Sequence, residues 1–251
     1  MKQSYKRAVS AKFKIFPMSN CSHCDPKKLA NFVSFPLTVI LENVETDGAW
    51  LRMLVAKLRP ALKRFFDVNP PHVELYNAGG IGEIPKALSR VVEERSKAGP
   101  VGTLPRVMAV ADSDAKSPGA PANNAVEVSR KAQKLGVISH VLSKRTIENY
   151  IPDRALLAYC EKRVDRRPAG LMITSLGREA RDHYPMKEGL SGGEIAVSKI
   201  YPANTMVKLG LGDFVLDLLN NFYHTIEVHD LHYRDGKNEL NGLLDTLEGN
   251  L

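Results

Sequence analysis

RVMAVADSD, residues 106–114, is the stretch that decides the fold. Its first six residues form a short apolar run typical of a buried strand, and acids follow at Asp112 and Asp114. A second such run, LTVIL at Leu37–Leu41, is followed directly by Glu42. In an open parallel sheet, ligands bind outside the carboxyl ends of the strands. Acids placed directly after two strands therefore predict a functional site at that edge.

Short strand patterns alternate with helical patterns around this stretch, which indicates βαβ units and a parallel sheet. The expected strands are Leu37–Leu41, Val73–Tyr76, Arg106–Ala111 and Val137–Leu142. The expected helices are Gly48–Phe66, Ile84–Lys97, Ala125–Leu135, Ala155–Val164 and Phe214–Tyr223. Pro60 is expected to kink or break the first helix, and Gly136 is a good end signal for the third. We therefore expect an α/β fold, with a Rossmann-like parallel sheet flanked by helices.

Three parts of the chain are expected: a basic N-terminal arm over 1–34, the α/β domain over 35–152 and a mainly helical C-terminal lobe over 153–251. The net charge of +7 favours a polyanionic partner such as nucleic acid. Basic residues are densest in the arm, at Lys2, Lys6, Arg7, Lys12, Lys14, Lys27 and Lys28. This clustering suits an arm that faces nucleic acid, and a solvated terminus fits the pattern equally well.

The three cysteines, Cys21, Cys24 and Cys160, are too few for a disulfide scaffold. Cys21 and Cys24 have the spacing of half a zinc knuckle, but no second Cys or His pair follows closely, so a reduced turn is the preferred interpretation. The chain shows no secretory signal after its basic start and no apolar run long enough to span a membrane. We expect a cytoplasmic protein without a membrane partner.

Glu42, Asp112 and Asp114 would repel one another if the sheet gathers them at one edge. A hard divalent cation with oxygen ligands, such as Mg²⁺, would relieve this repulsion. The alternative is structural, because Asp112 and Asp114 could form a turn with a helix cap and Glu42 could cap the following helix.

This order of motifs resembles the TOPRIM domain, which has a Glu after its first strand, a glycine turn after its second and Asp-x-Asp after its third. The glycine turn here is Asn77–Gly82, and the resemblance covers about residues 36–152. It implies that Glu42 is the catalytic acid, that Glu42, Asp112 and Asp114 bind metal, and that the cofactor is Mg²⁺ or Mn²⁺, with two ions.

Two later segments are similar to the OLD-like TOPRIM nucleases of bacterial antiphage defence. KRTIENYIP, residues 144–152, resembles their Arg-x-x-Glu-Asn-Tyr segment, which would make Glu148 a further metal ligand. HYPMKEG, residues 183–189, resembles the segment that brings a Lys to the active site, here Lys187.

The first motif departs from the family pattern, because Asn43 replaces its usual Gly. The supporting acid that normally follows could be Glu45 or Asp47. Lys144 and Arg145 are candidate contacts to nucleic acid.

The resemblance implies a Mg²⁺-dependent nuclease that cleaves phosphodiester bonds as the toxic effector of an antiphage defence system. Its substrate could be DNA or RNA, including tRNA, and self-association is left open. The chain has no Gly-x-x-x-x-Gly-Lys-Ser/Thr phosphate-binding loop. The ATPase that accompanies such nucleases, of the ABC/SMC-like type, must therefore be a separate partner.

Two other functions remain open at this point. A haloacid-dehalogenase-type phosphatase also places Asp-x-Asp after a strand, with the first Asp as nucleophile, but after its first strand rather than its third. A non-catalytic TOPRIM module would bind nucleic acid or a protein partner without turnover. Trapping of an aspartyl-phosphate mimic on Asp112 would favour the phosphatase, and metal-independent binding without cleavage would favour the module.

Overall fold

The computed structural model describes residues 35–98, 105–192, 199–201 and 209–251. Among these residues, four parallel strands form one sheet in the order β2-β1-β3-β4. The strands are β1 (Leu37–Leu41), β2 (Val73–Asn77), β3 (Val107–Ala111) and β4 (Ile138–Val141). The expected α/β class, with a Rossmann-like parallel sheet flanked by helices, is confirmed. The basic arm expected over 1–34, with Cys21 and Cys24, lies outside the described residues.

The two central strands, β1 and β3, are buried along their whole length. Their uninterrupted apolar sequences are what a strand covered on both faces requires. The strand register pairs Leu41 with Asn77 and Ala111 with Val141, so the carboxyl ends of all four strands meet at one edge. The chain segments that begin with Glu42 and Asp112 leave the sheet at this edge.

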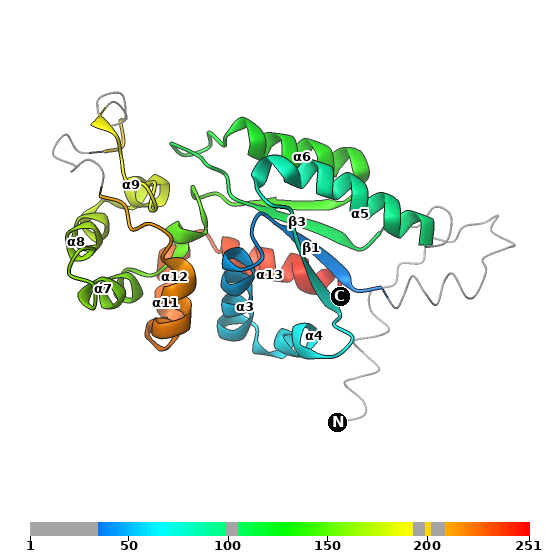
Figure 1. Ribbon diagram of the computed structural model, residues 1–251, viewed down its shortest axis with the longest axis horizontal. Helices are drawn as coiled ribbons and strands as arrows, with labels where there is room; N and C mark the ends of the chain where they lie inside the picture. Colours follow the sequence, from blue (N-terminus) through cyan, green and yellow to red (C-terminus); the bar gives the residue numbers. More distant parts are fainter. Residues whose placement is uncertain (1–34, 99–104, 193–198, 202–208) are drawn as a thin grey trace, which may run out of the picture.

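Helices cover both faces of the sheet (Figure 1). The helices on one face are α5 (Ile84–Ala98) and α6 (Asn123–Leu135), and those on the other are α3 (Thr46–Leu58) and α13 (Glu239–Gly249). Because successive strand residues point to opposite faces, Ile40 belongs to the core under α5 and α6, whereas Leu41 belongs to the core under α3. The sheet therefore holds two separate apolar cores.

Proline and glycine set the helix boundaries as the sequence predicts. α3 ends at Leu58, and the short helices η1 (Pro60–Leu62) and α4 (Lys63–Asp67) follow. Pro60 cannot continue α3, because it lacks an N–H donor and its ring clashes with the preceding turn. At the end of α6, Gly136 adopts a left-handed conformation with φ of 67°, which closes the helix at little steric cost.

Most of the described residues after Pro152 lie in helices. The α-helices described there before α13 are α7 (Asp153–Glu161), α8 (Arg167–Ser175), α9 (Arg178–His183), α11 (Val215–Phe222) and α12 (Val228–Asp235). Their buried side chains continue the core that lies under α3. The last helix, α13, returns to the sheet, where Arg59 Nη2 lies 3.0 Å from Asp245 Oδ1 and Arg106 donates to the Leu251 carbonyl at 2.8 Å. Within the described residues, no helix is both long and apolar enough to cross a membrane.

Glu239, the first residue of α13, joins this helix to the end of β4. Its carboxylate accepts hydrogen bonds from the Ser143 backbone N–H at 2.8 Å and from the hydroxyls of Ser143 and Tyr150. Its Oε1 also lies 3.2 Å from His140 Nε2. Burial alone would raise the pKa of Glu239, but these hydrogen bonds outweigh it and lower the pKa to about 2. The ionised carboxylate is therefore the form that stabilises the fold.

We expect Glu239→Gln to lower the free energy of unfolding near neutral pH by about 1–3 kcal/mol, the usual cost of weakening a buried, charge-assisted hydrogen-bond group. Because the folded-state pKa is depressed, this stabilisation is fully present above the unfolded value near ~4.3 and is lost as pH falls toward the folded value. Urea unfolding over a pH series measures it, with Glu248→Gln on the exposed face of the same helix as control. A difference from wild type that stays constant from neutral to acid pH would contradict this role.

Candidate metal centre

The structure brings the carboxylates of Glu42, Asp112 and Asp114 together at the carboxyl edge of the sheet. Glu42 follows β1 and Asp112 follows β3, and these two strands are neighbours. Burial raises the pKa of Glu42, and the negative charges of Asp47 and Asp114 raise it further. Burial also raises the pKa of Asp112 well above its usual range, with Glu148, Asp47 and Glu42 adding to the effect. The acids are therefore close enough to oppose one another's ionisation.

The structure separates Glu45 from Asp47, which the sequence leaves as alternatives. Asp47 lies in the first turn of α3, where its carboxylate accepts the Asn43 backbone N–H at 2.9 Å and the Thr46 hydroxyl at 3.1 Å. Its charge raises the pKa values of Glu42 and Asp112, whereas the Glu45 side chain is exposed. Residues two apart on a helix do not share a face. Asp47 is therefore the acid that joins the centre.

Glu148 enters the centre from the short helix η3 (Ile147–Tyr150), which directly follows the loop after β4. Thr146 and Asn149 form a reciprocal capping box that holds this helix in place. The Glu148 side chain is only 2% exposed, and its charge raises the pKa values of Asp112 and Asp114. A buried acid facing other acids is unfavourable without a compensating cation. Helix-dipole stabilisation alone therefore does not explain Glu148.

Asp112 also has a structural role. Its Oδ1 accepts the backbone N–H of Ile147 at 3.0 Å, at the start of η3. This bond is not a local helix cap, because the N-cap of η3 is Thr146; it ties the end of β3 to the segment that carries Glu148. One carboxylate oxygen of Asp112 thus makes a structural hydrogen bond, and the same carboxylate also interacts with the neighbouring acids.

Asp114 adopts a left-handed backbone conformation with φ of 48°, which is uncommon for a residue other than glycine. Its N–H donates to the Arg145 carbonyl at 2.9 Å, and the neighbouring Ser113 hydroxyl donates to the Lys144 carbonyl at 2.6 Å. Such backbone strain gathers at functional sites, where surrounding contacts hold it. Burial raises the pKa of Asp114, and the nearby charge of Arg145 offsets part of that effect.

Lys187 supplies a positive charge to the group. Its Nζ lies 3.4 Å from Glu148 Oε1 and 3.4 Å from Asp213 Oδ1. Burial alone would lower the pKa of Lys187, but Glu148 and Asp213 raise it above its ordinary value. Lys187 in turn lowers the pKa values of Glu42 and Asp114. The expected catalytic Lys is therefore charged and in contact with the acids.

Two adjacent backbone segments hold Lys187 in position. Leu211 N–H donates to the Met186 carbonyl at 2.7 Å, and Gly212 N–H donates to the Lys187 carbonyl at 2.9 Å. A Cβ at Gly210 would lie 2.1 Å from the Lys187 carbonyl oxygen, so only glycine fits there. Sequence reasoning missed this support and also missed Asp213. The Gly-Leu-Gly-Asp pattern at residues 210–213 was the available signal.

The chain was compared with protein-family models, with curated proteins and with solved structures, and none of these comparisons finds a match. The TOPRIM resemblance therefore stays a prediction.

The donor set of the centre suits an oxygen-preferring divalent cation in its chemistry. Its carboxylates belong to Glu42, Asp47, Asp112, Asp114 and Glu148. Hard cations such as Mg²⁺ select carboxylate oxygens. A bound cation would favour the ionised forms of Glu42, Asp47, Asp112 and Asp114, whose pKa values burial and neighbouring acids raise. Within the described residues, no three Asp, Glu, His or Cys side chains are already arranged around one common point as ligands.

Lys144 and Arg145, the expected contacts to nucleic acid, lie in different environments. Lys144 is 3% exposed, and its Nζ lies 2.5 Å from Asp182 Oδ1. Arg145 is half-buried, and its charge lowers the pKa of Asp114. Lys144 is therefore held in a buried ion pair, whereas Arg145 lies beside the acids. Their contact with nucleic acid stays a prediction.

Proposed function

We propose that this chain is a metal-dependent nuclease of the TOPRIM type, which hydrolyses phosphodiester bonds with Mg²⁺ or Mn²⁺. The observation that carries the proposal is the gathering of five mutually repelling carboxylates and one lysine at the carboxyl edge of a parallel sheet. Such an edge is where open α/β folds bind ligands. Raised carboxylate pKa values in one place are also more typical of functional sites than of structural ones.

The roles of the side chains follow from their positions. Asp112, Asp114 and Glu148 would hold the cation group, with Glu42 and Asp47 beside them. The bound cations would supply an activated water and charge stabilisation for phosphoryl transfer. Lys187 is fully charged and lies against Glu148, so its ammonium group can stabilise negative charge that develops on the phosphate. Glu42, with its raised pKa, is the candidate for proton transfer.

The biological setting is proposed from the TOPRIM resemblance together with the charge of the chain. A net charge of +7 suits a nucleic-acid substrate. The OLD-like segments point to an antiphage effector, and the lack of a phosphate-binding loop in the sequence places ATP hydrolysis on a separate ABC/SMC-like ATPase. On this proposal, the isolated chain is nearly inactive until that partner activates it.

A cleavage assay tests the function directly. The purified chain, alone and with an ATPase encoded next to it, is incubated with plasmid DNA and with total RNA in Mg²⁺, Mn²⁺ or EDTA. We expect cleavage that requires metal and that rises strongly with the ATPase. Metal-induced thermal stabilisation of the isolated chain gives a second readout that needs no activator. Intact substrates in every arm, together with an unchanged melting temperature in metal, would reject the nuclease assignment.

A further inference from the structure

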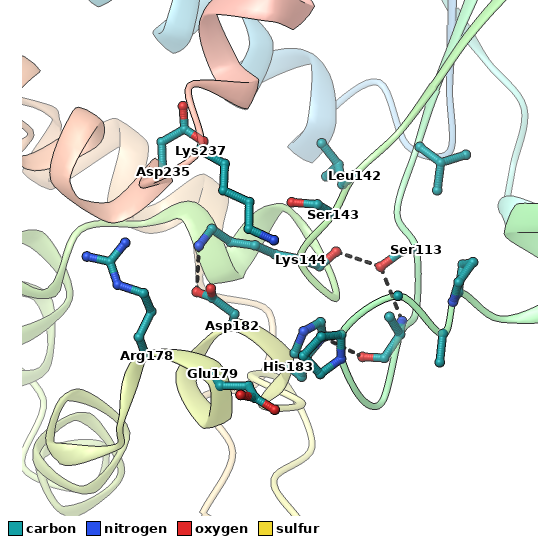
Figure 2. Close-up of a pocket in the computed structure, with 16 residues that line it drawn as sticks. Ser113, Leu142, Ser143, Lys144, Arg178, Glu179, Asp182, His183, Asp235 and Lys237 are labelled. Carbon is teal, nitrogen blue, oxygen red and sulfur yellow. Dashed lines mark hydrogen bonds and ion pairs between the residues drawn. The ribbon is translucent and has the colours of Figure 1, made fainter. Parts of the chain in front are cut away.

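A pocket of about 720 Å³ lies next to the acidic centre, on the side of β4. Its walls come from the loop after β3, the end of β4, helix α9 and the turn before α13, and Figure 2 shows their side chains facing a common space. Ser113 lines this pocket, although its sequence neighbours Asp112 and Asp114 belong to the acidic centre. Pocket and centre therefore share one wall. The volume lies within the range of about 300–1,000 Å³ that is usual for small-molecule sites.

One side of the pocket is apolar. It is formed by Ala115, Pro118, Ala120, Pro121, Val141 and Leu142. These side chains are short or rigid, so they offer a smooth wall with little conformational freedom to lose on binding. A wall of this kind suits a flat ring system, which gains by burying its faces.

The other side of the pocket carries cations, at Lys144, Arg178 and Lys237. Figure 2 shows Lys237 extending toward Lys144 from the turn before α13. The Arg178 guanidinium lies 5.2 Å from the centre of the Tyr233 ring, and it occupies space that a side chain at Gly236 would fill. Among the described residues, neither Arg178 nor Lys237 has an acidic side chain within ion-pair distance. Both are thus available to an anion.

Two of the three carboxylates near these cations, those of Asp182 and Asp235, are already engaged by the protein. Asp182 Oδ1 lies 2.5 Å from Lys144 Nζ and 2.5 Å from Arg234 Nη2, so two cations share one carboxylate. Asp235 accepts the N–H groups of Glu239 and Leu240 at the start of α13. The Glu179 carboxylate points away from Lys144 and Lys237 in Figure 2. With Arg234, which also pairs with Asp182, four basic side chains face three acidic ones here, so the formal charge of this group is +1.

The electrostatics of Lys144 agree with this balance. Burial and the positive charge of Arg234 together lower the pKa of Lys144 to about 8, although the Asp182 carboxylate opposes both effects. An anion bound beside Lys144 would favour its charged form.

We propose that this pocket binds one nucleotide, with its base against the apolar wall and its phosphate facing Lys144, Arg178 and Lys237. The nucleotide belongs to the strand being cut, because Ser113 lines the pocket and its two sequence neighbours, Asp112 and Asp114, belong to the acidic centre. That part of the inference rests on the proposed function. The pocket would hold the strand in register with the acids and would read the base next to the cleaved bond.

Binding without metal tests the pocket separately from cleavage. Dye-labelled single-stranded RNA and DNA oligonucleotides are titrated in EDTA and followed by fluorescence anisotropy, with unlabelled nucleoside monophosphates as competitors. We expect Lys237→Glu and Arg178→Glu each to weaken oligonucleotide binding roughly ten-fold, because a phosphate contact becomes a repulsion. Ala120→Trp should weaken binding as much by filling the apolar side, with little dependence on salt.

Lys134→Glu is the matched control, since it makes the same charge change at the exposed end of α6, at the opposite edge of the sheet. Equal weakening by Lys134→Glu and Lys237→Glu, or unchanged binding in Ala120→Trp, would overturn the pocket. A different result would overturn the inference that the nucleotide belongs to the cleaved strand. In that result, binding of the monophosphate depends on Lys237 and Arg178, whereas binding of the oligonucleotide does not. The pocket would then be a site for a free nucleotide. Pocket-dependent binding in a chain that never cleaves would reject the nuclease but keep the pocket.

Discussion

Asp112→Asn should reduce metal-dependent cleavage at least roughly a thousand-fold while leaving the metal-free protein as stable as wild type or more so. Asn keeps an oxygen that can accept the Ile147 N–H, so the hydrogen bond seen at 3.0 Å survives. It removes the charge that Glu148, Asp47 and Glu42 oppose. Loss of that charge relieves repulsion in the metal-free state and removes a ligand from the metal-bound state.

The pH dependence of this stabilisation has a definite sign. Burial and the neighbouring acids raise the folded-state pKa of Asp112 well above its ordinary range. The ionised carboxylate therefore destabilises the fold above that raised pKa, and the penalty fades as pH falls toward the ordinary value, where both states are protonated. The gain from Asp112→Asn should grow as pH rises from the ordinary pKa of Asp toward the raised folded-state pKa, and it should disappear in acid.

Thermal unfolding with and without Mg²⁺ or Mn²⁺, at matched ionic strength, measures both effects. Asp112→Ala separates the hydrogen bond to Ile147 from the charge, because it removes the acceptor as well and should cost about 1 kcal/mol relative to Asn. Asp165→Asn, at an exposed acid in the turn before α8, serves as the control. Equal metal-induced shifts in the melting temperature of wild type and Asp112→Asn would show that Asp112 does not bind the metal, and would contradict both the metal centre and the nuclease proposal.

Lys187→Ala should lower kcat by about 10²–10³-fold with little change in the melting temperature, because its half-exposed side chain acts on charge rather than on core packing. Lys187 lowers the pKa values of Glu42, Asp47 and Asp114. Without it these acids hold their protons to higher pH, so the acidic limb of the pH–rate profile should move upward. A merely structural lysine would not move that limb.

Lys187→Arg and Lys134→Ala complete this test. Arg keeps the charge near Glu148 and should retain the pH profile even where its geometry lowers the rate, whereas Lys134→Ala should behave as wild type. Asp213→Asn removes the other ion-pair partner of Lys187. The Asp213 side chain is 86% exposed, so solvent screens that pair and the substitution should change the rate less than Lys187→Ala does. Wild-type turnover in Lys187→Ala would exclude Lys187 from the chemistry.

Much of the fold follows from local patterns. The apolar runs before Glu42 and Asp112 became the two central strands, because strands buried on both faces need continuous apolar sequence. Pro60 ended α3, and Gly136 closed α6, for backbone reasons that act within one or two residues. Parallel topology then placed the ends of β1 and β3 at the same edge.

The assembly of the candidate site was only partly predictable. Glu42, Asp112 and Asp114 could be named because strand ends alone position them, and Glu148 and Lys187 because their segments resemble a known family. Glu45 and Asp47 could not be separated in the sequence, because the choice depends on which way the first turn of α3 faces once it packs against the sheet.

The sequence by itself determined which segments are strands and which acids stand at their ends, since both depend on neighbours along the chain. Only the tertiary structure decided that Asp213 pairs with Lys187, that Lys144 is buried against Asp182 and that α13 returns to cover the sheet. Each of these contacts joins residues far apart in sequence. Their energies depend on desolvation and on distances between elements, which become defined only when the helices pack together.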